Sequence, residues 1–328
     1  MANNNDQFKA FNTSIKLSND KKDELLKNRK ALRKKIKKYF EENKPDEIQP
    51  KFHSQGSFEM NTTVNPIPVW SDEDDKNLYK YDIDDGVYFI GDEDQDDRYS
   101  IQTYHNWIYD AVDGHTGKDP IDKNTCVRVI YADGHNIDLP IYYKKGDIPE
   151  LAHKTKGWIE SDPKEFYEWF NEETKTNRQL RRIVRYLKAW KDYRESSNSQ
   201  KKMPSGFILT ILATDNIAYS KDRDDIALKD TLKNIKLALD SKFECLRPTS
   251  PKGEDLLNGY ANKDYFLNEL DKFVTSAEQA INGSNPKDAC MKWQKHFGDR
   301  FCCSTAKDID EKATSFSSPA VVPSTTSA

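Results

Sequence analysis

Residues 81–89, with the sequence YDIDDGVYF, decide what kind of fold this chain adopts. The side chains of a β-strand alternate between its two faces, so Asp82 and Asp84 point the same way while Ile83 points into the core. Apolar residues flank the pair and mark the strand as buried, and carboxylates among buried strands need partners such as metal ions. The segment therefore predicts a pair of carboxylates on one face of a sheet.

A second acidic position lies further along the chain. Residues 125–143 read as two strands joined by a tight Asp133-Gly134 turn, which indicates a β-hairpin. Asp138 lies in the second strand and would add a third carboxylate to the first pair. Such a group suits two hard divalent cations, which are expected to be Mg²⁺, with Mn²⁺ as a possible substitute. The chemistry that it predicts is two-metal phosphoryl transfer.

The sequence Gln55-Gly56-Ser57-Phe58 precedes these strands. Together with DIDDGVY at 82–88, it resembles the nucleotidyltransferase superfamily, and it is most similar to the bacterial cGAS/DncV-like nucleotidyltransferases. That family makes cyclic oligonucleotide signals in anti-phage (CBASS) defence. The resemblance implies an α/β, polymerase beta-like nucleotidyltransferase core with a C-terminal α-helical lobe. It also implies synthesis of a cyclic di- or trinucleotide second messenger from ATP or other nucleoside triphosphates.

The resemblance assigns roles to the residues of these motifs. Asp82 and Asp84 would hold the metal bound to the donor triphosphate, and both with Asp138 would hold a second metal that activates the attacking ribose hydroxyl. Gln55, Gly56 and Ser57 would bind the nucleotide: a glycine lets the backbone approach the phosphates closely, and the serine supplies donors.

Two segments of the helical half resemble phosphate-binding segments of related enzymes. The run LKAW at 187–190 resembles a Leu-Lys-x-Trp segment beside the triphosphate, which gives Lys188 that role. The sequence PSGF at 204–207 resembles a turn whose serine touches the same phosphates. The alternative for Ser205 is a helix N-cap, and both can hold, because a helix N-terminus favours anionic oxygens. Lys188 would lie on a basic flank that faces the cleft, with Arg178, Arg181 and Arg185.

The domain organisation follows from the periodicity. Residues 19–43 predict a long helix opened by Ser18 and closed before Pro45, acting as a spine behind the sheet. Beyond about residue 160 the pattern is helical, with helices expected at 163–173, 177–194, 205–219, 224–242, 262–283 and 286–297. We therefore expect a nucleotidyltransferase core with the spine helix at 1–150, a helical lobe at 151–303 and a disordered tail at 304–328.

Composition excludes several classes of protein. The net charge is −4, which does not fit an enzyme that must grip long nucleic acid, so no nucleic acid is expected to be required. Five cysteines without a Cys-x-x-Cys pair argue against a disulfide framework and for a reducing compartment. The first residues lack a signal-peptide pattern and no apolar run is long enough to span a membrane, so we expect a cytoplasmic protein without membrane association.

The last residues suggest a partner. The segment 304–328 is small and polar and ends in Ser-Ala. In operons of the family that the sequence resembles, a ubiquitin-transfer-like enzyme often joins the synthase's C-terminal carboxylate to a target amine. The resemblance therefore implies Ala328 as a conjugation point, and the alternative is a tail with no role.

Three other functions compete with cyclic synthesis. A linear, template-independent polymerase of the oligoadenylate synthase type shares the three aspartates. A toxin-type nucleotidyltransferase would modify another molecule, although such chains are usually shorter. A catalytically inactive nucleotide-binding module could use the same fold, but the presence of all three aspartates counts against it.

Overall fold

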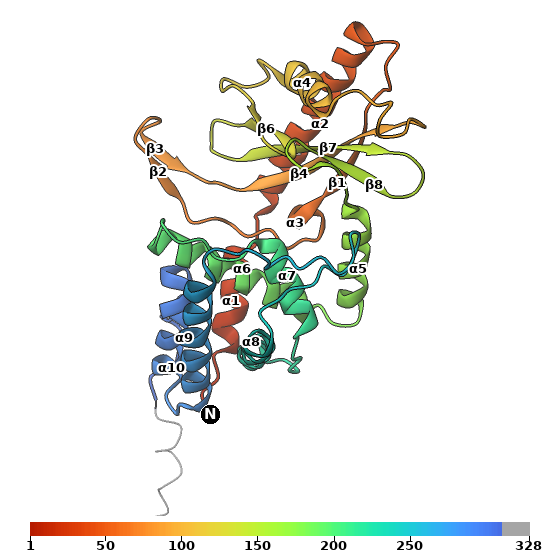
Figure 1. Ribbon diagram of the computed structural model, residues 1–328. Helices are drawn as coiled ribbons and strands as arrows, with labels where there is room; N and C mark the ends of the chain where they lie inside the picture. The colour runs from red at the N-terminus through yellow and green to blue at the C-terminus, as the bar shows by residue number, and fades with distance from the viewer. Residues whose placement is uncertain (310–328) are drawn as a thin grey trace, which may run out of the picture.

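The structure is a computed structural model that describes residues 1–309, and these residues form two lobes. A mixed sheet with two helices against it makes the upper lobe of Figure 1, and a bundle of helices makes the lower lobe. The α/β core with a helical lobe that the sequence predicted is confirmed.

The bounds of the elements are as follows. The strands are β1 Lys51–Gln55, β2 Val69–Ser71, β3 Lys76–Leu78, β4 Asp82–Ile90, β5 Ile121–Asp122, β6 Cys126–Ile130, β7 Asn136–Lys144, β8 Pro149–His153 and β9 Gly157–Glu160. The helices are α1 Asn5–Ile15, α2 Asn19–Asn43, α3 Gly56–Glu59, α4 Ile101–Val112, α5 Pro163–Lys175, α6 Gln179–Ser197, α7 Gly206–Asp215, α8 Asp224–Ser241, α9 Lys263–Asn282 and α10 Pro286–Phe297.

The central sheet is built around β4 and β7. Its strands run in the order β1-β4-β7-β6-β5, with β8 paired to β7 and β9 paired to β8. The β4–β7 pair is parallel, and β6–β7 is the antiparallel hairpin that the Asp133-Gly134 turn predicted. Six of the nine residues of β4 and eight of the nine of β7 are buried, as expected for central strands.

The spine helix α2 has the predicted bounds. Ser18 caps it, since its Oγ accepts a hydrogen bond from the Lys21 backbone N–H. The apolar stripe of α2 packs with α4 and with the core-facing side chains of β4, such as Ile83, Val87 and Phe89. This packing covers one face of the sheet, and the carboxylates of Asp82 and Asp84 lie on the other face.

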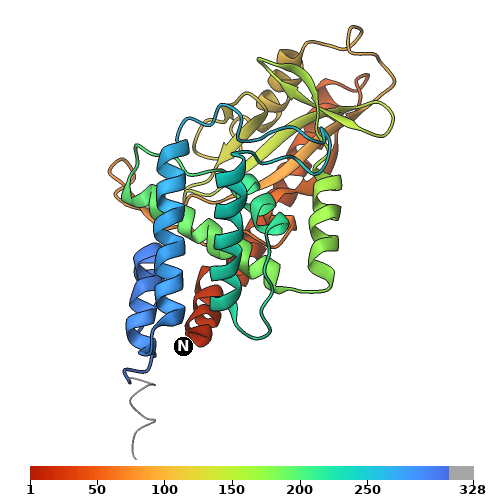
Figure 2. The same cartoon turned by 60° about the horizontal axis from the view of Figure 1, so that its bottom comes forward.

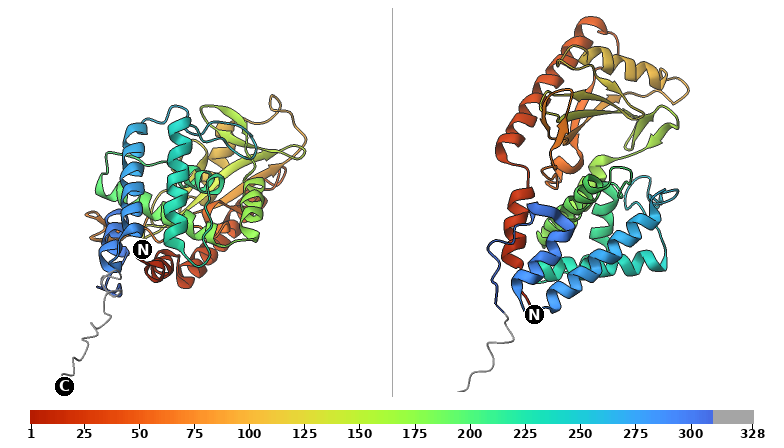
Figure 3. Two further views of the ribbon diagram at one scale, coloured as in Figure 1. Left: turned by 90° about the horizontal axis from the view of Figure 1, so that it is seen from below. Right: turned by 90° about the vertical axis from the view of Figure 1, so that its left-hand side faces the viewer.

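A second core lies inside the helical lobe, where α8 and α9 run side by side (Figure 2). Helix α1 belongs to this core, because Phe8 and Phe11 pack against Tyr186 and Phe297. Figure 3 shows α1, in red, with the helices of this lobe. The boundaries at 150 and 303 stay predictions. The packing departs from them in two ways: α1 joins the helical lobe, and the sheet continues to Glu160.

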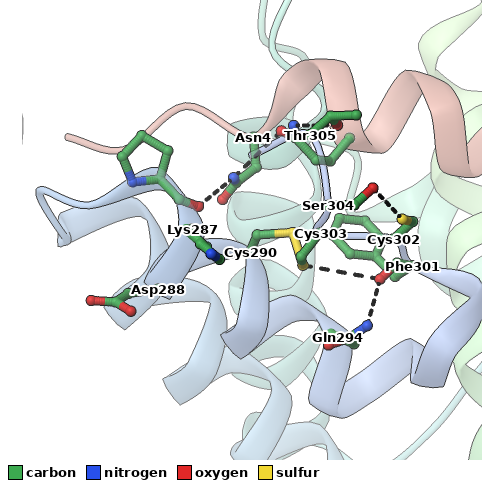
Figure 4. The surroundings of a disulfide bond; sticks show 12 residues. Asn4, Lys287, Asp288, Cys290, Gln294, Phe301, Cys302, Cys303, Ser304 and Thr305 are labelled. Atoms are coloured by element: carbon green, nitrogen blue, oxygen red, sulfur yellow. Dashed lines mark hydrogen bonds between the residues drawn. A yellow bond between two sulfur atoms is a disulfide. The ribbon is translucent and has the colours of Figure 1, made fainter. Parts of the chain in front are cut away.

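A disulfide joins Cys290 of α10 to Cys303 (Figure 4). The cysteine pattern predicted no disulfide framework, and this pair corrects that prediction. The chain turns back after α10, and Gln294 Nε2 donates to the Phe301 carbonyl at 3.0 Å, which brings the two cysteines together. Cys126, Cys245 and Cys302 are free thiols.

Two predictions concern membranes and the tail. None of the helices between residues 1 and 309 has the length and apolar character that crossing a membrane requires. The predicted conjugation point Ala328 lies outside the described residues, as does most of the segment 304–328.

Candidate active site in the cleft between the lobes

Four side chains of the site form one row across the sheet. Gln55 pairs with Asp84 between β1 and β4, Asp84 with Asp138 between β4 and β7, and Asp138 with Arg128 between β7 and β6. Directly opposed residues of neighbouring strands project from the same face. The sheet register therefore brings together residues that are up to 83 positions apart, and the row faces the helical lobe.

Burial and neighbouring negative charges disfavour the ionised forms of Asp82 and Asp84. Burial raises the pKa of Asp84 well above its usual range, and the charges of Asp82 and Asp138 add to this effect. Burial, followed by the charge of Asp138, also raises the pKa of Asp82. Ionised oxygens held together in this way need a counter-cation, and hard oxygen ligands are those that Mg²⁺ and Mn²⁺ take. The residues present therefore fit a divalent metal.

Asp138 forms a bidentate ion pair with Arg128. Its two oxygens accept hydrogen bonds from Nε at 2.6 Å and from Nη2 at 2.7 Å, and the same guanidinium lies 3.6 Å from Asp82. Within residues 1–309, no three histidine, cysteine or acidic side chains are arranged as a preformed metal centre. A metal shared by all three aspartates stays a prediction.

The sequence reasoning missed Arg128. A two-residue Asp133-Gly134 turn would place Val129 opposite Asp138. In the structure Tyr131 pairs with His135, so the loop has three residues, 132–134, and this register places Arg128 opposite Asp138. The cation beside Asp138 therefore follows from the observed loop.

The Gly-Ser turn approaches the carboxylates closely. Gly56 has φ +73°, and a Cβ at this position would collide with Oδ2 of Asp84. The Ser57 hydroxyl lies 2.9 Å from the Thr63 hydroxyl, and the Ser57 carbonyl accepts from the Thr62 N–H at 2.8 Å. The turn is thus fixed to the segment that follows it, and only glycine fits at its first position.

Gln55 is a buried support of this turn. Its Nε2 donates to the Tyr142 hydroxyl at 3.0 Å, and its Oε1 accepts from the Tyr88 hydroxyl at 3.3 Å. The two tyrosine rings stack with centroids 4.6 Å apart. Gln55 reaches the cleft wall, but its amide is already satisfied, so its predicted nucleotide contact remains a prediction beside an evident structural role.

Lys188 projects from α6 into the cleft beneath the start of α7. Its Nζ donates to the Thr62 hydroxyl at 3.0 Å, and its Cε would lie 3.1 Å from a Cβ at Gly206. Burial lowers the pKa of Lys188 to about 8, and the charges of Asp82, Asp192 and Asp84 partly offset this. A buried ammonium group beside the carboxylates is suited to bind phosphate oxygens.

The rest of the predicted basic flank does not face the cleft. Arg181 donates to the Met60 carbonyl at 3.3 Å, and Arg185 donates to the Asn61 carbonyl at 2.7 Å. Arg181 and Arg185 are therefore hydrogen-bonded to carbonyl oxygens of the segment that follows the Gly-Ser turn. These arginines join the lobes, which leaves Lys188 as the member of the flank that lines the cleft.

Ser205 caps α7. Its Oγ accepts from the Ile208 N–H at 3.2 Å, as the N-cap alternative predicted. The side chain is exposed, while its neighbours Gly206 and Phe207 line the cleft. Contact between Ser205 and a phosphate stays a prediction.

These residues enclose a cleft of about 600 Å³ between the lobes. Gly56, Ser57, Asp82 and Asp84 line it from the sheet side, and α5, α6 and α7 line it from the other. Leu151, Phe166, Tyr167, Phe207 and Arg247 form one end, and Val64, Pro66, Lys191 and Asp192 also line it. The volume lies within the range of small-molecule sites.

Comparisons with known proteins agree with this geometry. Residues 50–142 match the family model described as the nucleotidyltransferase domain of cyclic GMP-AMP synthase DncV-like proteins. This segment holds the turn, Asp82, Asp84 and Asp138. The residues that carry the site are thus similar to the nucleotidyltransferase domain of DncV-like proteins.

The similar proteins include bacterial cyclic GMP-AMP synthases. One from Escherichia albertii is 30% identical over 213 residues, which cover 62% of this chain and 44% of that protein. One from Vibrio cholerae is 26% identical over 323 residues, covering 77% of this chain and 68% of that protein. The match to the first of these spans less than half of the relative's length.

Solved structures share the fold. The Vibrio cholerae DncV cyclic AMP-GMP synthase with a nonhydrolysable GTP superposes with a TM-score of 0.73 at 20% identity, covering 88% of this chain and 93% of that one. The same enzyme with the linear intermediate pppA(3′,5′)pG gives a TM-score of 0.71 at 20% identity, with the same coverage.

Proposed function

We propose that this chain is a metal-dependent nucleotidyltransferase that joins nucleoside triphosphates into a cyclic di- or trinucleotide second messenger for anti-phage defence in the cytoplasm. The observation that carries the proposal is the row of Asp84, Asp138 and Arg128 beside Asp82, with the Gly-Ser turn and Lys188 in the same cleft. Relatives named as cyclic GMP-AMP synthases support the product class.

The residues of the cleft would divide the reaction between them. Asp82 and Asp84 would hold Mg²⁺ or Mn²⁺, with Asp138 as a further ligand. When bound, the metals neutralise triphosphate charge and lower the pKa of the attacking hydroxyl. The Gly56-Ser57 turn and Lys188 bind and orient the donor triphosphate so that the bond to be broken lies opposite the attacking oxygen.

The transfer forms one bond and breaks one bond at the α-phosphorus of the donor. The ribose hydroxyl oxygen forms a bond to the α-phosphorus of the donor, and the bond from that phosphorus to the bridging oxygen breaks. Pyrophosphate leaves with the electron pair. Asp138 would accept the hydroxyl proton. A second transfer, in which the linear intermediate's own hydroxyl attacks its remaining triphosphate, closes the ring.

One incubation tests this function. The protein is mixed with the four nucleoside triphosphates and Mg²⁺, and the products are treated with phosphatase and read by mass spectrometry. A cyclic product has no terminal phosphate and survives the phosphatase. Products that lose phosphates would indicate the linear, oligoadenylate synthase-like alternative, and binding without any product would indicate an inactive nucleotide-binding module.

Lys188→Ala should raise the KM for triphosphate roughly 10- to 100-fold with a smaller change in kcat. The reason is the loss of a charge-assisted hydrogen bond of about 1.5–3 kcal/mol to the donor phosphates. Steady-state kinetics at saturating Mg²⁺ measure both constants. Lys188→Arg keeps the charge and should lose much less affinity.

The pKa of Lys188, about 8, adds a pH dependence. The lysine binds phosphate only when it is protonated, so KM should rise as the pH increases above about 8. Lys188→Arg should remove this rise, because guanidinium stays protonated there. An unchanged KM for Lys188→Ala at pH 7 would assign the lysine to the packing between α6 and α7 alone.

A further inference from the structure

Asp192 is an acidic residue of the cleft with no role in the metal group. It lies four residues after Lys188 on α6, about 6 Å further along the helix axis, and its side chain lines the same cleft. Asp192 is not among the principal charges that act on Asp82 and Asp84. Its charge acts on Lys188, which lies between it and these carboxylates in the cleft wall.

No hydrogen bond or ion pair within residues 1–309 engages the Asp192 carboxylate. The cations around it are bonded elsewhere: Lys191 to Glu195 at 2.6 Å, Lys188 to Thr62, and Arg300 to backbone carbonyls. Burial raises the pKa of Asp192 to about 6. The side chain is half-buried in the cleft wall, and its oxygens have no protein donor, so a ligand in the cleft can supply one.

The walls next to Asp192 are apolar. Arg300 donates to the Asn65 carbonyl at 2.9 Å and to the Ala189 carbonyl at 3.0 Å, so it holds the segment around Asn65 against the turn of α6 that precedes Asp192. Val64 and Pro66, on either side of Asn65, line the cleft. Apolar side chains with a carboxylate at their edge suit a flat heterocycle, whereas a phosphate would be repelled by the carboxylate.

We infer that Asp192 accepts hydrogen bonds from a guanine base and sets the base preference at this end of the cleft. The inference rests on the proposed function. Guanine presents its N1–H and an N2–H side by side, and these two parallel donors match the two oxygens of a carboxylate. Adenine and cytosine present an acceptor beside their amino group, and uracil presents one N–H between two carbonyl oxygens, so each places an acceptor against the carboxylate.

Binding of three triphosphates tests this inference. Dissociation constants are measured with nonhydrolysable analogues of GTP, ITP and ATP in excess Mg²⁺. The unaltered protein should bind the GTP analogue roughly 10- to 100-fold more tightly than the ITP analogue, which lacks the 2-amino group. Asp192→Asn should lose that difference without weakening ATP binding, because adenine gains nothing from the carboxylate. Asp288→Asn, an equal charge change at an exposed residue of α10, should retain the difference.

The outcomes separate this inference from the proposed function. Equal affinity of the unaltered protein for the GTP and ITP analogues would overturn the role of Asp192. So would an equal loss for all three triphosphates in Asp192→Asn, because the carboxylate would then act only by holding the charge of Lys188. Failure of the unaltered protein to bind any triphosphate would instead overturn the proposed function. Asp192→Asn should melt no lower than the unaltered protein, since the ionised carboxylate is unpartnered.

Discussion

Replacing Asp82 and Asp84 together by asparagine should reduce nucleotide joining roughly a thousandfold or more while the protein stays folded. The change keeps side-chain volume but removes the negative oxygens that hold the metal, and metal ions supply several kcal/mol of transition-state stabilisation. Turnover is measured by release of pyrophosphate at saturating triphosphate and Mg²⁺. Turnover at the unaltered rate would show that these carboxylates do not hold the catalytic metal.

The same double variant should melt no lower than the unaltered protein when both are free of metal. The pKa of Asp84 is raised in the folded protein, so its ionised form costs stability at neutral pH. For a carboxyl with a raised pKa, stability falls as the pH rises from the unfolded value of 3.8 through the raised folded value. The stability of the asparagine variant should not decrease in this way as the pH rises. Melting temperatures of both proteins, measured between pH 4 and pH 7 in the presence of a chelator, would show the difference in pH dependence.

Asp85→Asn is the matched control in the same strand. Asp85 is buried on the opposite face and pairs with Arg33, whose Nε lies 2.7 Å from its Oδ2. Breaking a buried ion pair from one side costs about 3–5 kcal/mol, and the partial exposure of Arg33 reduces that cost. Asp85→Asn should therefore lower the melting temperature and spare turnover per folded molecule, which is the reverse of the double variant.

Gly56→Ala should have the second-largest effect, with a fall in turnover of roughly 100-fold or more. Its φ of +73° costs an alanine about 1–2 kcal/mol, and the added Cβ would meet Oδ2 of Asp84. The collision must move either the turn or the carboxylate, and displacement of a reacting group by about 1 Å costs about 100-fold. Turnover and urea unfolding of the same preparation measure the two effects.

Gly114→Ala separates the backbone penalty from the collision. Gly114 has φ +63°, and nothing lies within 4 Å of the position that its Cβ would take. This variant should show the same modest loss of stability with unchanged turnover. If Gly56→Ala also kept full turnover, close approach of the turn to Asp84 would not be needed for catalysis.

The sequence by itself determined the parts of the fold that depend on local patterns. The Ser18 cap and the apolar stripe of α2 predicted its bounds, because a helix end needs a side-chain acceptor and a packed helix needs an apolar face. The alternation in β4 predicted that Asp82 and Asp84 share a face. The Asp133-Gly134 turn predicted the hairpin that carries Asp138.

The tertiary structure alone decided which distant groups meet. Arg181 and Arg185 lie on the same side of α6 as Lys188. The two arginines hydrogen-bond to carbonyl oxygens after the Gly-Ser turn, whereas Lys188 projects into the cleft. The sequence does not show that Lys188 bonds to Thr62, or that Arg300 bonds to the carbonyls of Asn65 and Ala189. Burial and hydrogen-bond partners depend on the packing of segments far apart in the chain, whereas capping, periodicity and turn geometry act within a few residues. For this reason the carboxylate pair was evident from the sequence, and the charge balance around it was not.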